Sequence, residues 1–115
     1  MNIVIKSPEA DALEESLGSK ADPENRRLRR FLEMPDLSRA PGSPIRELVE
    51  NILSIPDFKE FDAIEVPEIV PVSVGFDLFD FPTDHSARSR SDTYYVDDNN
   101  ILRTHTTVMW YYYLN

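Results

Sequence analysis

Residues 93–107 read Thr93-Tyr94-Tyr95-Val96-Asp97-Asp98-Asn99-Asn100-Ile101-Leu102-Arg103-Thr104-His105-Thr106-Thr107, and this stretch decides the fold class. Both flanks, residues 93–96 and 101–107, are rich in β-branched and aromatic side chains, which favour strands. The residues between them, 97–100, are all Asp or Asn, which are typical of turns. The stretch therefore predicts a β-hairpin with a four-residue turn.

One face of the second predicted strand carries polar groups. Successive side chains of a strand point to opposite faces, so Arg103, His105 and Thr107 are expected on the same face. A guanidinium, an imidazole and a hydroxyl in a row can hold the carboxylate and ammonium groups of a small zwitterion. Tyr95 from the first strand can reach the same face. A solvated strand face without a ligand remains the alternative.

The segment before the hairpin combines a broken strand with an aromatic loop. After the third helix the apolar spacing shifts from period 3.6 toward period two, at Ile64, Val66 and residues 69–70. Pro67 interrupts this run, which indicates an edge strand or a bulge. Residues 76–82 read Phe-Asp-Leu-Phe-Asp-Phe-Pro. We interpret them as a compact loop whose aromatic side chains pack in the core.

Three helices are predicted in the first half of the chain by a capping residue followed by proline. They are expected at residues 8–17, from Asp22-Pro23 to Met34-Pro35, and from Ser43-Pro44 to Pro56. The third has apolar residues at helical spacing, which predicts one buried stripe: Ile45, Leu48, Val49, Ile52 and Leu53. Residues 108–114 are apolar on all sides, which predicts a last buried helix.

Residues 35–42 have the composition of a linker, with two prolines and a glycine. We therefore divide the chain into an N-terminal helical segment with its linker, residues 1–42, and a second part, residues 43–115. The fold class is α+β. Neither part contains an internal repeat.

The chain of 115 residues has a formal charge of −9, which disfavours free-standing nucleic-acid binding unless basic residues cluster locally. One such cluster exists: Arg26, Arg27, Arg29 and Arg30. These arginines can meet phosphate, or they can form a solvated helix face paired with Glu24 and Glu33. The sequence favours the second interpretation but leaves both open.

Other classes of site find little support. The chain has no cysteine and only two histidines, so a zinc site is not expected. A hydrolase using His85 or His105 lacks a nucleophile-elbow sequence. The start of the chain lacks the apolar core of a signal peptide and no stretch reaches membrane-spanning length, so we expect a cytoplasmic protein without a membrane partner.

Four blocks of sequence carry a resemblance to a known family. Residues 76–82, 84–88, 92–95 and 102–107 resemble, in the same order and at similar spacing, successive motifs of the phenylalanyl-tRNA synthetase alpha chain. The resemblance covers residues 43–115, and the helix from Ser43 with the strand through residues 66–68 looks like the first class II motif. In that class this motif builds the subunit interface.

The resemblance implies a partial class II antiparallel sheet flanked by helices and preceded by short N-terminal helices. It implies a ligase that condenses phenylalanine with ATP and Mg²⁺ to an adenylate and then transfers the acyl group to tRNA. The implied partners are a synthetase beta chain, or a second copy through the first motif. For this chain alone no cofactor is expected.

The resemblance also assigns roles to residues. His105 and Thr107 fall where the family holds the amino-acid end of phenylalanine, Tyr95 flanks that site, and Arg103 supports it. His85 and Arg88 lie in a loop that can contact tRNA or support neighbouring loops. No residue of the chain is assigned to chemistry itself or to a metal.

Some positions depart from the family pattern. Ser43 replaces histidine, Ser86 replaces proline, Thr107 replaces serine, and Trp110 stands where a glutamine normally contacts substrate. The motifs that clamp ATP are expected after Asn115, so we expect no adenylate synthesis by residues 1–115 alone. A non-catalytic binding or dimerisation module derived from a synthetase is the alternative, and unpaired sheet edges predict self-association.

Overall fold

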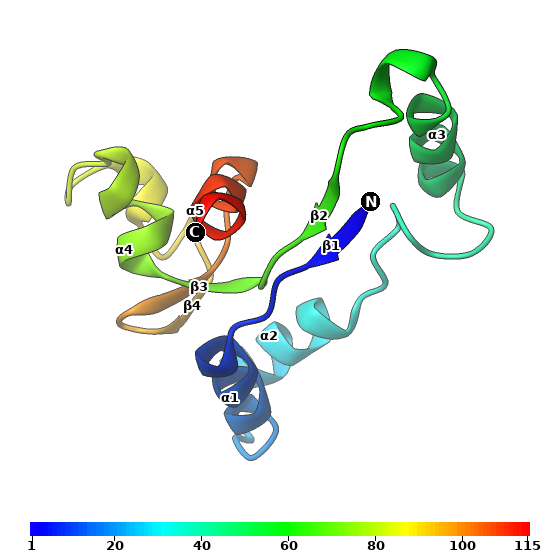
Figure 1. Ribbon diagram of the computed structural model, residues 1–115. Helices are drawn as coiled ribbons and strands as arrows, with labels where there is room; N and C mark the ends of the chain where they lie inside the picture. The colour runs from blue at the N-terminus through cyan, green and yellow to red at the C-terminus, as the bar shows by residue number, and fades with distance from the viewer.

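The structure is a computed structural model that describes all 115 residues. Three helices fill the first half of the chain (Figure 1): α1 (Pro8–Leu17), α2 (Pro23–Glu33) and α3 (Pro44–Leu53). Each begins with proline after a capping residue, as predicted. The capping oxygens of Ser7, Asp22 and Ser43 accept backbone N–H bonds of 3.2, 3.0 and 3.2 Å. These bonds satisfy N–H groups that a helix start leaves unpaired.

A three-stranded antiparallel sheet forms the centre of the second half, in the order β3 (Ile69–Pro71), β5 (Asn100–Leu102), β4 (Tyr95–Asp97). The predicted hairpin is confirmed, with Tyr95 opposite Ile101. Its turn is shorter than predicted, because only Asp98 and Asn99 lie between the strands. The Asp97 carboxylate stabilises the turn by accepting the Asn99 N–H at 2.8 Å.

The second strand of the hairpin ends at Leu102, so the predicted strand through Thr107 is wrong. The Arg103 N–H still donates to the Glu68 carbonyl at 2.8 Å. The next residue on that partner segment is Pro67, which has no N–H to continue the ladder. The chain leaves the sheet, bends at His105 and forms a 3₁₀ turn at Thr106–Val108 before α5 (Met109–Leu114).

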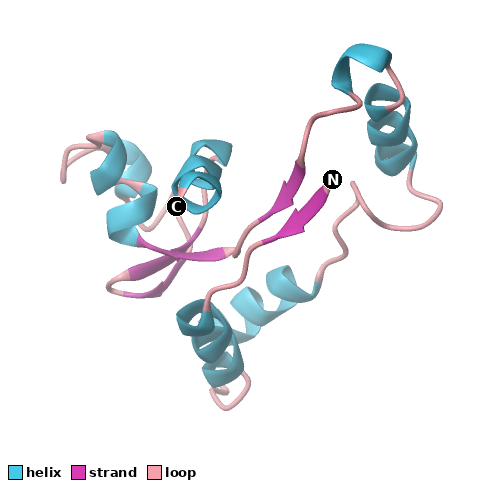
Figure 2. Ribbon diagram, viewed as in Figure 1, coloured by secondary structure: helices cyan, strands magenta, loops and turns pink.

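A second, parallel pair of strands brings the N-terminus of the chain beside residues 63–65 (Figure 2). Strand β1 (Asn2–Val4) pairs with β2 (Ala63–Glu65), with Ile3 opposite Ile64. We did not predict β1, although residues 3–5 are all β-branched. The predicted break near Pro67 is confirmed, since β2 and β3 are separate strands.

The core lies between β3, β5 and the aromatic loop. Val70, Phe76 and Ile101 are fully buried together, and Phe81 packs against them. A short helix that we did not predict, α4 (Val72–Gly75), leads into this loop. A side chain at Gly75 would bring its Cβ to 2.9 Å from Ile101 Cδ1, so glycine permits the close approach of α4 to the sheet.

The predicted burial of two apolar helices is wrong. No residue of α3 is buried, and Ile45, Leu48 and Ile52 are 48%, 58% and 43% exposed. Figure 1 shows the reason, since α3 stands away from both sheets and the other helices. Helix α5 also has no buried residue, and its Trp110 is 58% exposed. None of the helices combines the length and apolar character that crossing a bilayer requires.

Candidate functional site

The aromatic loop Phe76–Phe81 is the framework of the candidate site. A 3₁₀ turn at Asp77–Phe79 is followed by Asp80 in the left-handed region, at φ 59°. This reversal lets the Phe81 N–H donate back to the Phe76 carbonyl at 3.1 Å. The loop therefore closes on itself and holds Phe79 and Phe81 beside the core.

His105 is held against this loop by one hydrogen bond and two rings. Its Nε2 lies 2.7 Å from the Gly75 carbonyl oxygen. The imidazole stacks on Phe81 at a centroid distance of 5.8 Å and meets Phe79 edge-on at 5.4 Å. A carbonyl oxygen only accepts, so Nε2 carries the proton and Nδ1 of the neutral ring is an acceptor. Nδ1 has no hydrogen-bond partner in the protein and is not fully buried.

Arg88 ties together the loop that contains it and the aromatic loop. Its guanidinium donates to Asp77 Oδ1 at 2.7 Å and to the Phe81 carbonyl at 3.0 Å. It also lies over the Phe76 ring at 5.3 Å. His85 supports the same loop, because its Nδ1 accepts the Ala87 N–H at 3.0 Å and its ring packs on Phe81 at 4.9 Å.

Two side chains from the hairpin complete this arrangement. The Tyr95 hydroxyl donates to the Arg88 carbonyl at 2.5 Å, and the buried Thr93 hydroxyl donates to the Ala87 carbonyl at 2.5 Å. Residues 86–88 are therefore fixed from both sides. Thr93 was not among the residues that we selected from sequence, and no local pattern distinguishes it from the exposed threonines.

The structure separates the polar residues that we expected on one strand face. His105, Tyr95, His85 and Arg88 gather around the aromatic loop. Arg103 instead donates from Nε to the Pro67 carbonyl at 3.2 Å, beside β3. Thr107 is exposed in the 3₁₀ turn. The prediction that these residues share one strand face is wrong, because β5 ends at Leu102. Their roles in binding a ligand stay predictions.

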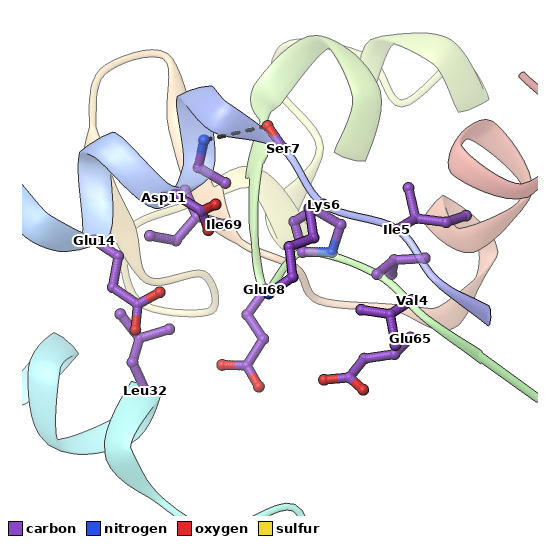
Figure 3. Close-up of a pocket in the computed structure, with 13 residues that line it drawn as sticks. Val4, Ile5, Lys6, Ser7, Asp11, Glu14, Leu32, Glu65, Glu68 and Ile69 are labelled. Carbon is purple, nitrogen blue, oxygen red and sulfur yellow. Dashed lines mark hydrogen bonds between the residues drawn. The ribbon is translucent and has the colours of Figure 1, made fainter. Parts of the chain in front are cut away.

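An acidic pocket of about 230 Å³ lies between α1 and the start of β3 (Figure 3). The sequence alone did not predict this pocket. Its carboxylates come from α1, from the end of β2 and from the segment that follows β2: Asp11, Glu14, Glu65 and Glu68. Lys6 is the one basic residue that lines it. Burial raises the pKa of the Glu68 carboxyl, and the nearby Arg103 guanidinium offsets part of this change.

An apolar cavity of about 480 Å³ lies between β2 and the C-terminal helix. Phe61, Ile64, Met109 and Trp110 line it, so Trp110 faces β2. The Tyr113 hydroxyl donates to Asp62 Oδ2 at 2.5 Å across this gap. This contact joins residues far apart in sequence, and no spacing pattern predicts it.

A family model described as tRNA synthetases class II core domain (F) matches residues 31–115. The chain belongs to this class II synthetase family. It is 38% identical over 71 residues to the phenylalanine–tRNA ligase alpha subunit of Desulfosudis oleivorans, covering 62% of this chain and 21% of that protein. It is 41% identical over 69 residues to the mitochondrial phenylalanine–tRNA ligase of Saccharomyces cerevisiae, covering 58% of this chain and 14% of that protein.

The resemblance stated from sequence is thus confirmed. The match to the alpha subunit of Mycoplasmoides gallisepticum reaches 39% identity over 80 residues, 66% of this chain and 23% of that protein. The chain spans about a fifth of the length of the alpha subunits that it matches. No solved structure gives a significant match. The mixed α and β architecture agrees with the class II synthetase family.

The family implies ATP with Mg²⁺, and we tested whether the side chains present suit the ion. No group of three or more His, Cys, Asp or Glu residues is arranged to hold a metal. The acidic pocket does not provide such a set either. Residues 1–115 therefore show no metal site built from protein side chains alone.

Proposed function

We propose that residues 43–115 are the front part of the catalytic domain of a phenylalanine–tRNA ligase alpha subunit. The observation that carries the proposal is His105, whose Nε2 is bound to the Gly75 carbonyl while Phe79 and Phe81 hold its ring. The alpha-subunit names of the matched relatives support the assignment to this ligase. A cytoplasmic location belongs to the same proposal.

His105 and Thr107 bind the amino-acid end of phenylalanine in this proposal. The free Nδ1 of His105 accepts a hydrogen bond from the substrate's α-ammonium group. The exposed Thr107 hydroxyl, which makes no hydrogen bond within the protein, donates to the substrate carboxylate. Tyr95 flanks the site by fixing residues 86–88, and Arg103 supports the chain where it leaves β5.

The reaction is amino-acid activation followed by acyl transfer. A carboxylate oxygen of phenylalanine attacks the α-phosphorus of ATP, and pyrophosphate leaves. A ribose hydroxyl at the end of tRNA then attacks the acyl carbon, and AMP leaves. This chain contributes orientation, because a fixed carboxylate reacts far faster than a freely moving one. His85 and Arg88 hold the neighbouring loop, which contacts tRNA in this proposal.

The test uses the complete ligase, with an alpha subunit that carries this segment and its beta subunit. Replacement of His105 by alanine should raise the KM for phenylalanine in pyrophosphate exchange by about tenfold or more, which equals about 1.4 kcal/mol of lost binding. His85→Asn is the control, because asparagine retains an acceptor for the Ala87 N–H. An unchanged KM in His105→Ala would contradict the assigned role.

A second candidate is a non-catalytic dimerisation or binding module. The exposed apolar stripe of α3 favours it, because Ile45, Leu48 and Ile52 have no cover within the chain. A contiguous apolar face of this kind marks a protein interface in soluble proteins. The partner in this proposal is a second copy or the synthetase beta chain. The two candidates are compatible, since a ligase subunit needs such an interface.

A further inference from the structure

The apolar cavity between β2 and α5, of about 480 Å³, is walled by aromatic side chains. Trp110 and Tyr113 belong to α5, where residues three apart lie on the same side of the helix. Phe61 comes from the segment that leads into β2. We call these three residues the aromatic wall. Their side chains are 59% exposed at Phe61, 58% at Trp110 and 39% at Tyr113, so the wall is not part of a closed core.

The rings of the aromatic wall do not pack on one another. Phe61 meets Phe58 edge-on at a centroid distance of 5.1 Å, and none of the ring contacts in the chain joins two members of the wall. The Tyr113 ring is held by its hydroxyl, which donates to Asp62 Oδ2 at 2.5 Å. The cavity between the three rings is therefore open to a ligand.

The charged groups of this cavity are carboxylates. Glu60 and Asp62 line it, and no lysine, arginine or histidine does. Asp62 Oδ1 lies 3.8 Å from the Met1 ammonium group, in a pair that water reaches because the Met1 side chain is 81% exposed. Such an exposed pair is weak, so it does not protect Asp62 from another cation. The same contact shows that an ammonium group can approach Asp62.

We propose that this cavity binds a small quaternary ammonium cation. The face of an aromatic ring is negative and attracts a cation, and tryptophan attracts it most strongly. A quaternary ammonium group is also apolar at its surface, so its methyl groups can pack on Phe61 and Trp110. The two carboxylates add attraction for the positive charge. The cavity volume lies within the range of about 300–1,000 Å³ that is usual for small-molecule sites.

Other small molecules suit the cavity less well. A neutral apolar molecule gains nothing from Glu60 and Asp62, and an anion is repelled by both. Phenylalanine brings a carboxylate of its own into the same repulsion. His105 does not line this cavity, because its ring is held by the aromatic loop instead. The inference therefore concerns a second site and goes beyond the proposed ligase function.

The chain has a single tryptophan, so the fluorescence of Trp110 reports on this cavity directly. The probe is choline, and its matched control is neohexyl alcohol, in which carbon replaces the charged nitrogen. Choline should change the fluorescence of the 115-residue chain along a saturating curve, with a Kd in the low-millimolar range. Neohexyl alcohol should bind about tenfold more weakly or worse, because it lacks the charge.

Two variants test the groups that carry the proposal. Glu60→Gln with Asp62→Asn should weaken choline binding by about tenfold, because both charges are lost while an amide oxygen still accepts the Tyr113 hydroxyl. Phe61→Leu keeps an apolar side chain but removes one ring face, and should weaken binding by about threefold. Circular dichroism spectra and melting temperatures verify that each variant folds.

The matched control is Glu47→Gln with Asp84→Asn, which removes the same charge from exposed residues outside the cavity. It should change the affinity for choline by less than about twofold, since distant exposed charges are screened. His105→Ala should bind choline as the unmodified chain does. Loss of phenylalanine binding in that variant, with choline binding intact, separates the fate of this inference from that of the ligase proposal.

Several outcomes would overturn the inference. Equal binding of choline and neohexyl alcohol would show that the charge is not recognised. Equal losses in the two double variants would show that only the total charge of the chain matters. A response to phenylalanine as strong as that to choline would assign the cavity to the amino-acid site. Much tighter binding of a peptide with trimethylated lysine would assign it to a protein partner, and unchanged fluorescence at about 50 mM choline would exclude a cation site.

Discussion

Arg88 is the residue on which the geometry of the candidate site depends most. Its guanidinium bonds Asp77 and the Phe81 carbonyl and covers the Phe76 ring, while its own carbonyl accepts the Tyr95 hydroxyl. The Arg88 side chain is only 13% exposed, whereas the Asp77 side chain is 55% exposed, so water reaches the pair from the Asp77 side alone. Arg88 therefore helps, with His85 and Phe76, to hold Phe81 where its ring stacks on His105.

Replacement of Arg88 by alanine should lower the free energy of unfolding by about 2 kcal/mol, because the part-buried bond to the Phe81 carbonyl, the pair with Asp77 and the cover over the Phe76 ring are lost together. Denaturant unfolding measures this change. Arg46→Ala is the control, since its pair with Glu50 is exposed and is expected to contribute about 0.5 kcal/mol or less. Similar losses in the two variants would contradict the structural role of Arg88.

Glu68 should make stability depend on pH in the acid range. Burial raises the pKa of its carboxyl, so the folded chain binds this proton more strongly than the unfolded chain. This contribution favours folding below the ordinary carboxyl pKa and disappears as pH rises through the raised value. Glu68→Gln removes the charged form and should stabilise the chain at pH 7, by about 0.5 kcal/mol or less because the residue reaches solvent.

Melting temperatures of Glu68→Gln and the unmodified chain at about pH 7 and about pH 3 measure this effect. The variant should melt slightly higher at neutral pH and at nearly the same temperature in acid. Glu65→Gln is the matched control, because Glu65 lines the same acidic pocket and its pairing with Arg39 would be weakened instead. A lower melting temperature for Glu68→Gln at pH 7 would contradict the pKa direction.

At the scale of elements, local sequence signals predicted where helices begin better than where strand β5 ends. Ser7, Asp22 and Ser43 each cap a helix as predicted, because capping depends on neighbouring residues alone. The end of β5 at Leu102 was not predictable from its own residues, which favour a strand through Thr107. It depends on Pro67 of another segment, which cannot donate to the ladder. Likewise β1 required a partner about 60 residues away.

The same limit applies to the candidate site. His105, Tyr95, His85 and Arg88 were selected from sequence, and the structure brings them to one loop. Their contacts, such as His105 with the Gly75 carbonyl, join segments 30 residues apart and have no sequence signal. The apolar spacing of α3 predicted an amphipathic helix but not its exposure, because spacing does not reveal what covers a stripe.

The stripe of α3 leads to a prediction about association. Leu48→Lys should scarcely change the stability of a monomer, since Leu48 is 58% exposed, but it should place an unpaired charge inside any interface built on α3. Size-exclusion chromatography with light scattering should show a dimer or larger species for the unmodified chain and a monomer for the variant. Lys59→Ala, outside α3, is the control and should leave assembly unchanged.

At the scale of the whole molecule, the chain is more open than a globule of its size. Its radius of gyration is 15.9 Å, against about 13 Å expected for a compact domain of this length. Only 12 of 115 residues are buried, and apolar side chains of α3 and α5 face solvent. Such a shape fits a segment that gains part of its core by contact with other protein surfaces, as the proposed ligase subunit would.

The central claim is that His105 binds the amino-acid end of phenylalanine, and an NMR titration of this chain tests it most directly. The chain has two histidines, so His85→Asn assigns the imidazole signals without ambiguity. Phenylalanine at up to about 20 mM should shift the His105 signals along a saturating curve, with a Kd in the millimolar range. N-acetylphenylalanine amide, which keeps the ring but lacks both charged groups, should have much less effect. Unmoved His105 signals, or equal shifts with phenylalanine and with this blocked analogue, would contradict the account.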